Sequence, residues 1–210
     1  MKHLFYASSL KFMDFISYPD FSIEKNKMTF ICGESGCGKS TLFKLMNASL
    51  SPSQGTLMYN DTDIGKTDTI ILRRDVTLIS QEPYLFDGTI KENFESYYSY
   101  RETSIPTDDR IKSFLSLCCI DLPLDTDCRN LSGGEKQRVY LAVFLSFPSK
   151  VYLLDEPTSA LDEYTANKLM GNIKGLCREN DLTALVISHD RSIVDRFADD
   201  VIELERGGDQ

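Results

Sequence analysis

The feature that most constrains the fold of this chain is a glycine-rich loop between an apolar run and a helical pattern. The apolar run is Met28–Cys32, the helical pattern begins at Leu42–Met46, and the loop reads Gly33-Glu34-Ser35-Gly36-Cys37-Gly38-Lys39-Ser40-Thr41. Strand, glycine-rich turn and helix are the context that the G-x-x-x-x-G-K-[ST] phosphate-binding motif requires. The glycines allow successive backbone N–H groups to point at phosphate oxygens, and the helix adds the positive end of its dipole.

Two residues of this loop carry functional groups of their own. The Lys39 ammonium would reach the outer phosphates of a nucleotide, and the Ser40 hydroxyl would bind Mg²⁺. A glycine turn that only caps a helix needs no lysine. Cys37 also lies in the loop. Either the positive surroundings make its thiol reactive, or it is only a small side chain that fits beside glycines. We therefore expect the chain to bind a nucleoside triphosphate with Mg²⁺.

Composition limits the classes of function. The chain has 210 residues, enough for one domain with a lobe inserted into it, and a formal net charge of −9, which argues against a duplex nucleic acid partner. No apolar run approaches the ~20 residues of a membrane-spanning helix, and the N-terminal run is too short for a signal peptide. The six cysteines have no metal-ligand spacing, so we expect free buried thiols in a reducing cytoplasm.

The order of apolar runs predicts an α/β fold with a parallel sheet covered on both faces. Residues 1–32 read as strands joined by turns, at Leu4–Tyr6, Phe21–Ile23 and Met28–Cys32, and so predict an antiparallel β subdomain at the N-terminus. A helix from Lys39 to about Ala48 follows the loop. Further strands are expected at the apolar runs Thr56–Tyr59, Val76–Ser80, Val151–Leu154 and Thr183–Ser188, with a last edge strand at Val201–Leu204.

A different texture begins at Tyr84. Strand-like runs disappear, and apolar residues take helical spacing at Ile111, Phe114, Leu115 and Cys118. We interpret residues 84–148 as a helical subdomain inserted into a single domain that spans 1–210.

Acidic residues follow one of the buried strands. Asp155 comes directly after Val151–Leu154, at the tip where a carboxylate that holds Mg²⁺ belongs. Buried charges are costly unless they are paired or bound to metal. Glu156 would point into the site as the base, or as an electrostatic anchor, for an attacking water. The alternative is a solvated acidic pair at the end of a strand.

A second glycine-containing turn precedes another helix. Ser132 is placed to cap that helix, and Gly133 and Gly134 leave backbone N–H groups open to an anion. The alternative is a capped helix without a ligand.

These motifs together resemble the ATP-binding cassette (ABC) ATPases along nearly the whole chain. The matching stretches follow the order found in that family: the phosphate loop Gly33–Thr41 (Walker A), Gln81 (Q-loop), Leu131–Glu135 (signature), Val151–Asp155 with Glu156 (Walker B and catalytic glutamate), Ser159–Asp162 (D-loop) and His189 (switch histidine). A phosphate-loop kinase or GTPase would give no reason for the signature.

The resemblance implies a mechanism. Two copies face each other head to tail, and each ATP lies between the Walker A loop of one copy and Ser132 and Gly134 of the other. The residues that the resemblance implies as catalytic are Glu156, which polarises water, His189, which holds the γ-phosphate and that water, and Gln81. Gln81 also joins Ser40 and Asp155 at Mg²⁺ and reports that site to a partner. Asp162 of the D-loop is expected at the nucleotide.

The family also stacks an aromatic side chain on adenine, upstream of Walker A. Counting back from Phe21–Ile23 places this residue at Phe12, with Phe15, Tyr6 and Tyr18 as open alternatives.

The resemblance implies a transport motor on the cytoplasmic face of the membrane, docked under a separate permease. The segment Pro83–Gly88 is apolar and turn-rich, which suits it to hold a short permease helix or to pack the lobe on the core. The alternative is a non-transport ABC ATPase in translation or DNA repair, although such proteins usually carry two cassettes or long insertions. Phe86–Ile90 and the compact length are similar to ATPases of small metal (iron) efflux systems.

Overall fold

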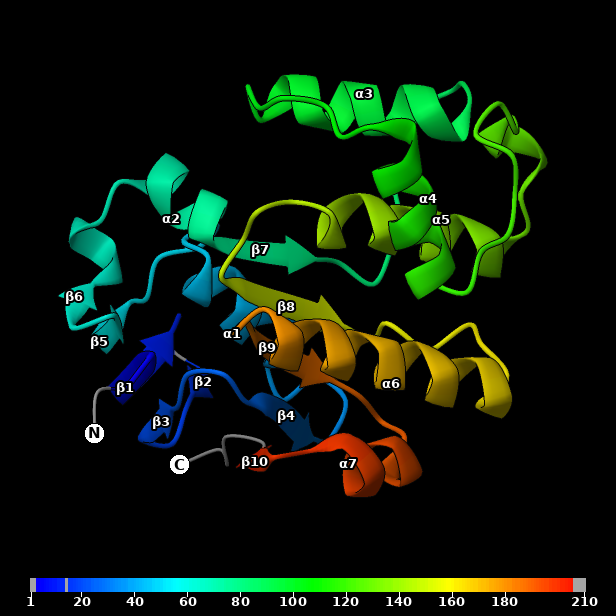
Figure 1. The fold of residues 1–210 in the computed structure, drawn as a ribbon. Coiled ribbons are helices and arrows are strands. Elements are labelled where there is room, and N and C mark those ends of the chain that lie inside the picture. The colour runs from blue at the N-terminus through cyan, green and yellow to red at the C-terminus, as the bar shows by residue number, and fades with distance from the viewer. Residues whose placement is uncertain (1–2, 14, 206–210) are drawn as a thin grey trace.

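A five-stranded parallel sheet forms the centre of the computed structural model, which describes residues 3–13 and 15–205 (Figure 1). Its strand order is β10-β4-β9-β8-β7, and every neighbouring pair is parallel. The strands are β4 (Met28–Gly33), β7 (Val76–Ile79), β8 (Val151–Asp155), β9 (Thr183–Ile187) and β10 (Asp200–Leu204). The parallel sheet and the edge position of the last strand are confirmed.

Both faces of this sheet are covered. All five residues of β8 and of β9 are buried, as expected of strands with no solvent-facing side. Their alternate residues enter two separate hydrophobic clusters, so that Leu154 packs on one face and Leu153 on the other.

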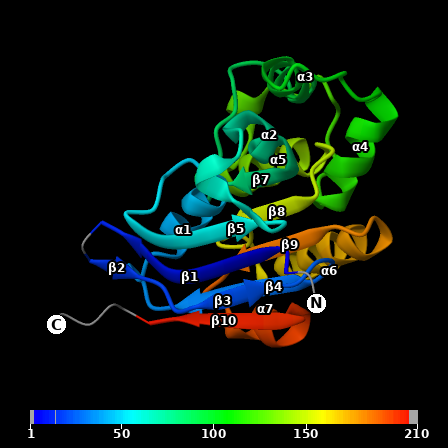
Figure 2. The same ribbon diagram turned by 90° about the vertical axis from the view of Figure 1, so that its left-hand side faces the viewer.

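The first face is covered by helices. In chain order these are α3 (Ile90–Tyr100), α4 (Asp108–Leu117), α5 (Gly133–Leu145), α6 (Glu163–Glu179) and α7 (Arg191–Phe197). The four residues expected on one helical face, at positions 111, 114, 115 and 118, are all buried around α4. Helices α3, α4 and α5 lie together beyond β7 (Figure 2) and fall within 84–148, whose bounds as an inserted subdomain remain a prediction.

The second face is covered by α1 (Lys39–Met46) and by an antiparallel sheet. That sheet contains β1 (Phe5–Phe12), β2 (Ile16–Ser17), β3 (Phe21–Ile23), β5 (Gln54–Tyr59) and β6 (Thr62–Asp63). Two expectations differ from this arrangement. The first strand runs on to Phe12 instead of ending at Tyr6. Residues 5–8 and Lys11 pair with β5 across an irregularity in the register, and Lys11 and Phe12 pair with β2. Thr62–Asp63, where the sequence predicted no strand, pairs with β5.

Three short helical segments were missing from the sequence prediction. They are α2 (Thr69–Asp75) and the 3₁₀ turns Ile64–Lys66 and Cys128–Asn130. Each begins at an aspartate whose carboxylate accepts a backbone N–H, at positions 68, 63 and 127. The cap signal was therefore present in the sequence, but these segments are too short to show a helical period.

Buried hydroxyls attach the helical lobe to the sheet. Tyr152 of β8 is 2% exposed, and its hydroxyl lies 2.9 Å from the Leu145 carbonyl and 2.8 Å from the Phe147 carbonyl, at the end of α5. Burial raises the pKa of Tyr152, so it stays a neutral hydrogen-bond donor. On α3, Tyr98 donates to the Ser146 carbonyl at 2.7 Å.

The cysteines are all free, as predicted. Five are buried and Cys119 is half-buried. Among residues 3–13 and 15–205, none of the helices is both long enough and apolar enough to span a membrane.

Candidate nucleotide site

The carboxyl ends of the parallel strands meet at one edge of the sheet. The register pairs Leu204 with Gly33, Ile31 with Ile187, Ile187 with Asp155 and Leu154 with Ile79. The residues that follow β4, β9, β8 and β7 are therefore neighbours in that order. This places the phosphate loop, His189, the Asp155–Glu156 pair and Gln81 side by side, as ligand sites in parallel sheets usually lie.

The phosphate loop has a backbone that two of its glycines make possible. Gly33 has φ +146°, and a Cβ there would lie 2.4 Å from the Leu204 carbonyl oxygen. Gly38 has φ +96°, and a Cβ there would lie 2.9 Å from the Ile16 side chain. Both positions combine a left-handed conformation with a close approach, which only glycine tolerates. Helix α1 begins directly after Gly38, so its N-terminal end faces the loop.

Lys39 lies folded against this loop. It is 7% exposed, and its ammonium donates to the Gly33 and Glu34 carbonyls, each at 2.8 Å. The Cys37 sulfur lies 3.9 Å from the same nitrogen, and the Cys37 side chain is buried. In the described part of the chain no carboxylate pairs with Lys39. The loop therefore presents a buried positive charge held only by neutral carbonyls, which suits phosphate oxygens.

Asp155 and Ser40 form the part of the site that fits a divalent cation. Asp155 is 8% exposed, and burial raises the pKa of its carboxyl group, while a hydrogen bond from Ser40 works in the opposite direction. Its Oδ1 atom is buried without a hydrogen-bond partner in the described residues. The unpaired carboxylate oxygen and the nearby hydroxyl are oxygen ligands of the kind that Mg²⁺ prefers. One or two carboxylates are enough for Mg²⁺ when phosphates supply further oxygens.

Glu156 lies between the other two residues expected at the site. Gln81 donates through Nε2 to one oxygen of the Glu156 carboxylate at 3.0 Å, and the other oxygen lies 3.1 Å from His189 Nε2. Three consecutive strands thus bring together the three residues expected to be catalytic. A hollow of about 550 Å³ opens beside them, lined in part by Ser159, Ser188 and His189.

The backbone of Glu156 is strained and heavily bonded. Its φ is +49°, a left-handed value that is costly for a glutamate. Its N–H donates to the Ile187 carbonyl at 3.1 Å, and its carbonyl accepts from Ser159 Oγ at 3.1 Å and Gln137 Nε2 at 3.2 Å. Gln137 lies on α5 and is 7% exposed. The sequence did not predict this role, because a glutamine between the charged residues Lys136 and Arg138 gives no indication of burial.

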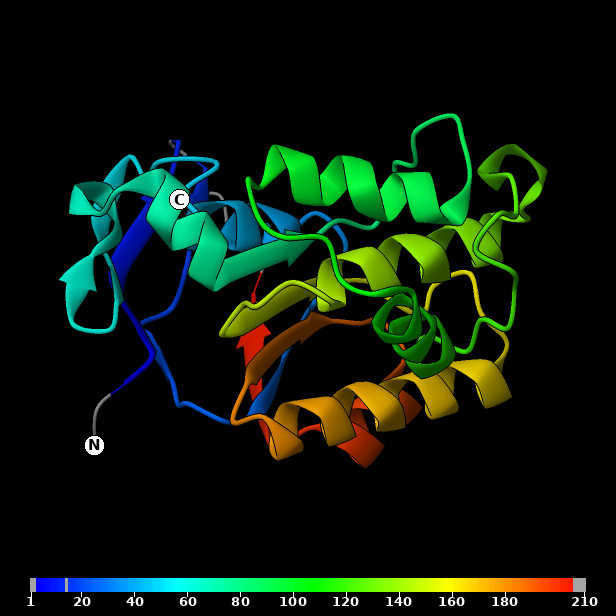
Figure 3. The same ribbon diagram turned by 45° about the horizontal axis from the view of Figure 1, so that its top comes forward.

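The signature turn is a capped helix start. Ser132 is the N-cap of α5, and its hydroxyl donates to the Glu135 carboxylate at 2.6 Å while the Ser132 N–H donates to that carboxylate at 2.9 Å. The capping expected of Ser132 is confirmed. Because the first N–H groups of a helix lack intrahelical partners, those at Gly133 and Gly134 are open to an anion. The start of α5 lies well away from the start of α1 (Figures 1 and 3).

Asp162, expected at the nucleotide, has a local partner. Its carboxylate caps α6 by accepting the Thr165 N–H at 2.9 Å and the Thr165 hydroxyl at 2.7 Å. These hydrogen bonds lower the pKa of Asp162. Its role at the nucleotide remains a prediction.

The four candidate aromatic residues differ in exposure. Tyr18 is buried and donates its hydroxyl to the Gly38 carbonyl at 3.0 Å, whereas Phe12 is half-buried against the core that covers the second face of the sheet. Tyr6 is 41% exposed and is the second residue of β1. Phe15 is 69% exposed and precedes Ile16, the residue in contact range of Gly38.

Fold and site together define a phosphate-loop nucleotide hydrolase, with a buried carboxylate, Asp155, at the end of β8 and Glu156 directly after it, between Gln81 and His189. The profile of the ABC transporter family matches residues 17–159. The chain belongs to this family, and it is an ATP-binding, ATP-hydrolysing component of the kind that ABC transporters use.

Individual relatives support the same assignment. The probable iron export ATP-binding protein FetA of Escherichia coli (strain K12) is 36% identical over 187 residues, which cover 89% of this chain and 82% of that protein. Two solved structures share the fold. CbiO1 of Clostridium perfringens, part of the ABC transporter complex cbiONQ, has a TM-score of 0.84 and 26% identity over 99% of this chain and 86% of that one. The ATP-binding cassette MJ0796, a dimer with ADP and Pi in a post-hydrolysis state, has a TM-score of 0.85 and 25% identity over 97% of this chain and 95% of that one.

Proposed function

We propose that two copies of this chain bind two ATP molecules between them, each nucleotide held by the phosphate loop of one copy and the signature turn of the other. The observation that supports this is the division of anion-binding groups within one chain. Lys39 and the N-terminal end of α1 lie at the sheet edge, whereas the open N–H groups of Gly133 and Gly134 lie apart, at the start of α5. A triphosphate carries more charge than either set neutralises alone, so ATP would join the two copies and hydrolysis would release them.

Within each site the residues have separate roles. Ser40, Asp155 and Gln81 would hold Mg²⁺, which supplies charge neutralisation between the outer phosphates. Glu156 would accept a proton from the attacking water, and His189 would hold the γ-phosphate and that water in line. Gln81 already contacts Glu156, so a change at the cation site would reach the base directly.

The sequence places Phe12 first as the residue that stacks on adenine. The exposed fractions of the aromatic side chains favour its alternative Phe15 instead. Phe15→Ala is expected to weaken ATP binding by about tenfold, the loss of one base–aromatic stack, whereas Phe12→Ala would mainly lower stability. Equilibrium titration with a fluorescent ATP analogue distinguishes the two residues. A tenfold loss in Phe12→Ala with no change in Phe15→Ala would restore the first assignment.

The partner is a separate transmembrane permease, so the chain would act on the cytoplasmic face of the membrane. The segment Pro83–Gly88 follows Gln81 and carries exposed apolar surface, since Tyr84 is 62% exposed beside Phe86 at 5.1 Å between ring centroids. This surface suits a short permease helix. No relative named above acts in translation or DNA repair, so that alternative gains no support.

The similarity to FetA supports metal export, iron in particular, as the transport task. Purification of the tagged chain from membranes should bring down a permease. Vesicles that contain both proteins should then move Fe²⁺ only with hydrolysable ATP. Absence of any co-purifying membrane protein would contradict the transport role.

The shared site has a test on the isolated chain. Ser132→Arg places a bulky cation on the signature turn without touching the phosphate loop. It should leave ATP binding to the monomer unchanged and prevent the ATP-driven dimer on a sizing column. An unchanged yield of dimer would contradict the shared site.

A further inference from the structure

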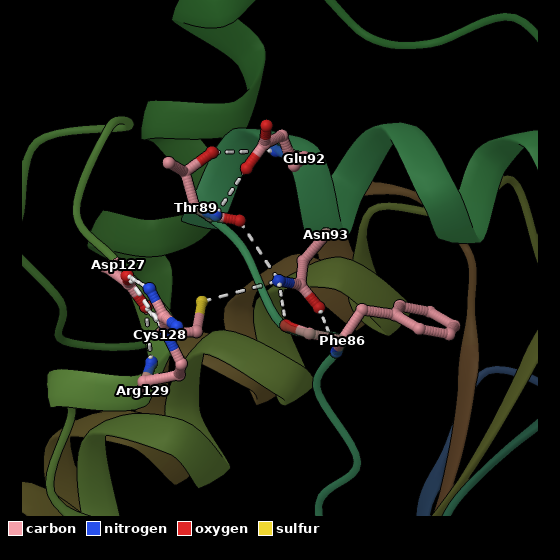
Figure 4. A network of polar contacts seen from close by, with 7 residues as sticks. All are labelled: Phe86, Thr89, Glu92, Asn93, Asp127, Cys128 and Arg129. Carbon is pink, nitrogen blue, oxygen red and sulfur yellow. Dashed lines mark hydrogen bonds and ion pairs between the residues drawn. The ribbon is translucent and has the colours of Figure 1, made fainter.

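Asn93 is a fully buried polar side chain to which the proposed catalytic cycle assigns no role. It lies on the first turn of α3, is 0% exposed, and uses its whole amide. Its Oδ1 accepts the Phe86 N–H at 2.8 Å, and its Nδ2 donates to the Phe86 carbonyl at 3.1 Å and the Thr89 carbonyl at 3.0 Å (Figure 4). The same Nδ2 lies 3.4 Å from the Cys128 sulfur.

On one side, Asn93 fixes the proposed docking surface. It bonds both backbone groups of Phe86, as a neighbouring strand would, and so sets where that residue lies. The Phe86 ring is the centre of an aromatic group, with Tyr84, Tyr97 and Tyr100 at ring-centroid distances of 5.1, 5.2 and 5.8 Å. Tyr84 and Tyr100 are 62% and 76% exposed. A permease segment seated on this surface would press directly on the residue that Asn93 holds.

On the other side, Asn93 touches the turn that leads into the signature. Cys128 begins the 3₁₀ turn Cys128–Asn130, which ends two residues before Ser132. The Cys128 N–H donates to the Gly88 carbonyl at 2.9 Å, and the Ile90 N–H donates to the Thr126 carbonyl at 3.0 Å. Burial raises the pKa of the Cys128 thiol to about 11, so the sulfur stays neutral and accepts only weakly. The loop after Gln81 and the approach to the signature are therefore joined at several points around one amide.

We propose that Asn93 is a positioning residue that transmits movement of the Phe86–Thr89 loop to the Cys128 turn, and through it to Ser132 and Gly134. The inference rests on the proposed function, because it links the permease surface of one chain to the ATP held by the other copy. The backbone contact at Gly88 does not hold Phe86, which lies two residues earlier and whose N–H and carbonyl both bond Asn93. Asn93 bonds Phe86 and the Thr89 carbonyl with the same amide that contacts the Cys128 sulfur, so it links the loop to that turn.

The test measures whether ATP bound at the signature turn changes amide hydrogen exchange at the docking surface. In the Glu156→Gln background, addition of Mg-ATP should form the dimer and slow amide exchange in peptides that cover residues 84–89 by about tenfold. Asn93→Leu keeps the side-chain volume and removes every hydrogen bond. With this change, ATP should still slow exchange in the phosphate loop, while the effect on residues 84–89 should fall to about twofold or less.

A matched control is available on α6. Asn172 also donates to a backbone carbonyl, that of Leu117 at 2.8 Å, and lies 3.9 Å from the Cys119 sulfur, but it is outside this path. Asn172→Leu should keep the full ATP effect on residues 84–89. If Asn93→Leu fails to fold, Asn93→Asp keeps the bond from the Phe86 N–H, removes the donors, and should show the same loss.

The outcomes distinguish the role of Asn93 from the shared ATP site. An equal ATP effect on residues 84–89 in the Asn93 and Asn172 variants would overturn the role of Asn93 and leave the shared site intact. No ATP effect on residues 84–89 in a background protein that does dimerise would also overturn it. Failure of the background protein to dimerise would instead overturn the shared site, and the inference with it.

Discussion

Replacement of Glu156 by glutamine is the sharpest change that the site allows. Glutamine keeps the size of the side chain and removes only its charge and its ability to accept a proton. The backbone cost of φ +49° is the same for both residues. Lys39 and Ser40 make no hydrogen bond to Glu156 among the described residues, so the groups expected to bind the phosphates stay in place.

The size of the effect follows from the two contacts of the carboxylate. One oxygen accepts from Gln81 at 3.0 Å and the other lies 3.1 Å from His189. An amide accepts through one atom and donates through the other, so one of the two contacts has to reverse its hydrogen-bond direction. Removal of a general base costs about 10²–10⁴-fold in rate. We expect kcat to fall by about 10³-fold, or about 4 kcal/mol in the activation free energy, with KM for ATP changed by less than about threefold.

The assay is steady-state phosphate release together with equilibrium ATP binding. Glu163→Gln is the matched control, because Glu163 lines the same hollow but belongs to the first turn of α6 and contacts neither Gln81 nor His189 in the described residues. It should hydrolyse ATP at nearly the parental rate. Hydrolysis by Glu156→Gln at the parental rate would refute the assignment of the base. An equal loss in both variants would point to the charge of the hollow instead.

Two further predictions concern contacts between the helical lobe and the sheet. Gln137→Met removes the donor to the Glu156 carbonyl at constant volume. We expect kcat to fall by only about three- to tenfold, with ATP binding unchanged, because the carbonyl keeps its bonds from Ser159. A kcat equal to that of the parent in a phosphate-release assay would show that Gln137 does not position the base. Tyr152→Phe removes a buried hydroxyl and should lower the free energy of unfolding in urea by about 1–2 kcal/mol, whereas Tyr100→Phe, 76% exposed, should have no measurable effect.

Much of the site could be predicted because parallel sheets bring the ends of distant strands together. Asp155, Glu156 and His189 each follow a buried apolar strand, so their positions at one edge follow from the strand pattern. The glycine loop could be predicted as well, because Gly33, Gly38 and Lys39 stand at the fixed spacing of the phosphate-binding motif, between an apolar run and a helical pattern. These inferences need only local patterns and the rules of sheet topology.

The remainder depends on packing between segments far apart in the chain. Gln137 and Asn93 look like ordinary polar residues of amphipathic helices, and only the tertiary structure shows that both are buried and bonded to backbone groups of other segments. For the adenine, the sequence placed Phe12 first and left Phe15, Tyr6 and Tyr18 open, and the exposed fractions of these side chains favour Phe15. The extension of β1 escaped notice for the same reason, because its partner β5 follows much later in the chain.

Mixing two inactive variants tests the shared site most directly. Lys39→Ala removes the ammonium of the phosphate loop, and Ser132→Arg blocks the signature turn, so each variant alone should be inactive. A mixed head-to-tail dimer contains one copy of each variant. In it, the phosphate loop of the Ser132→Arg copy meets the intact signature turn of the Lys39→Ala copy, which restores one complete site. Neither variant should form an ATP-driven dimer with itself, so the dimers that form are mixed and each has one complete site of the two. The mixture should therefore recover up to about half of the parental ATPase rate. A mixture no more active than the separate variants would contradict the account.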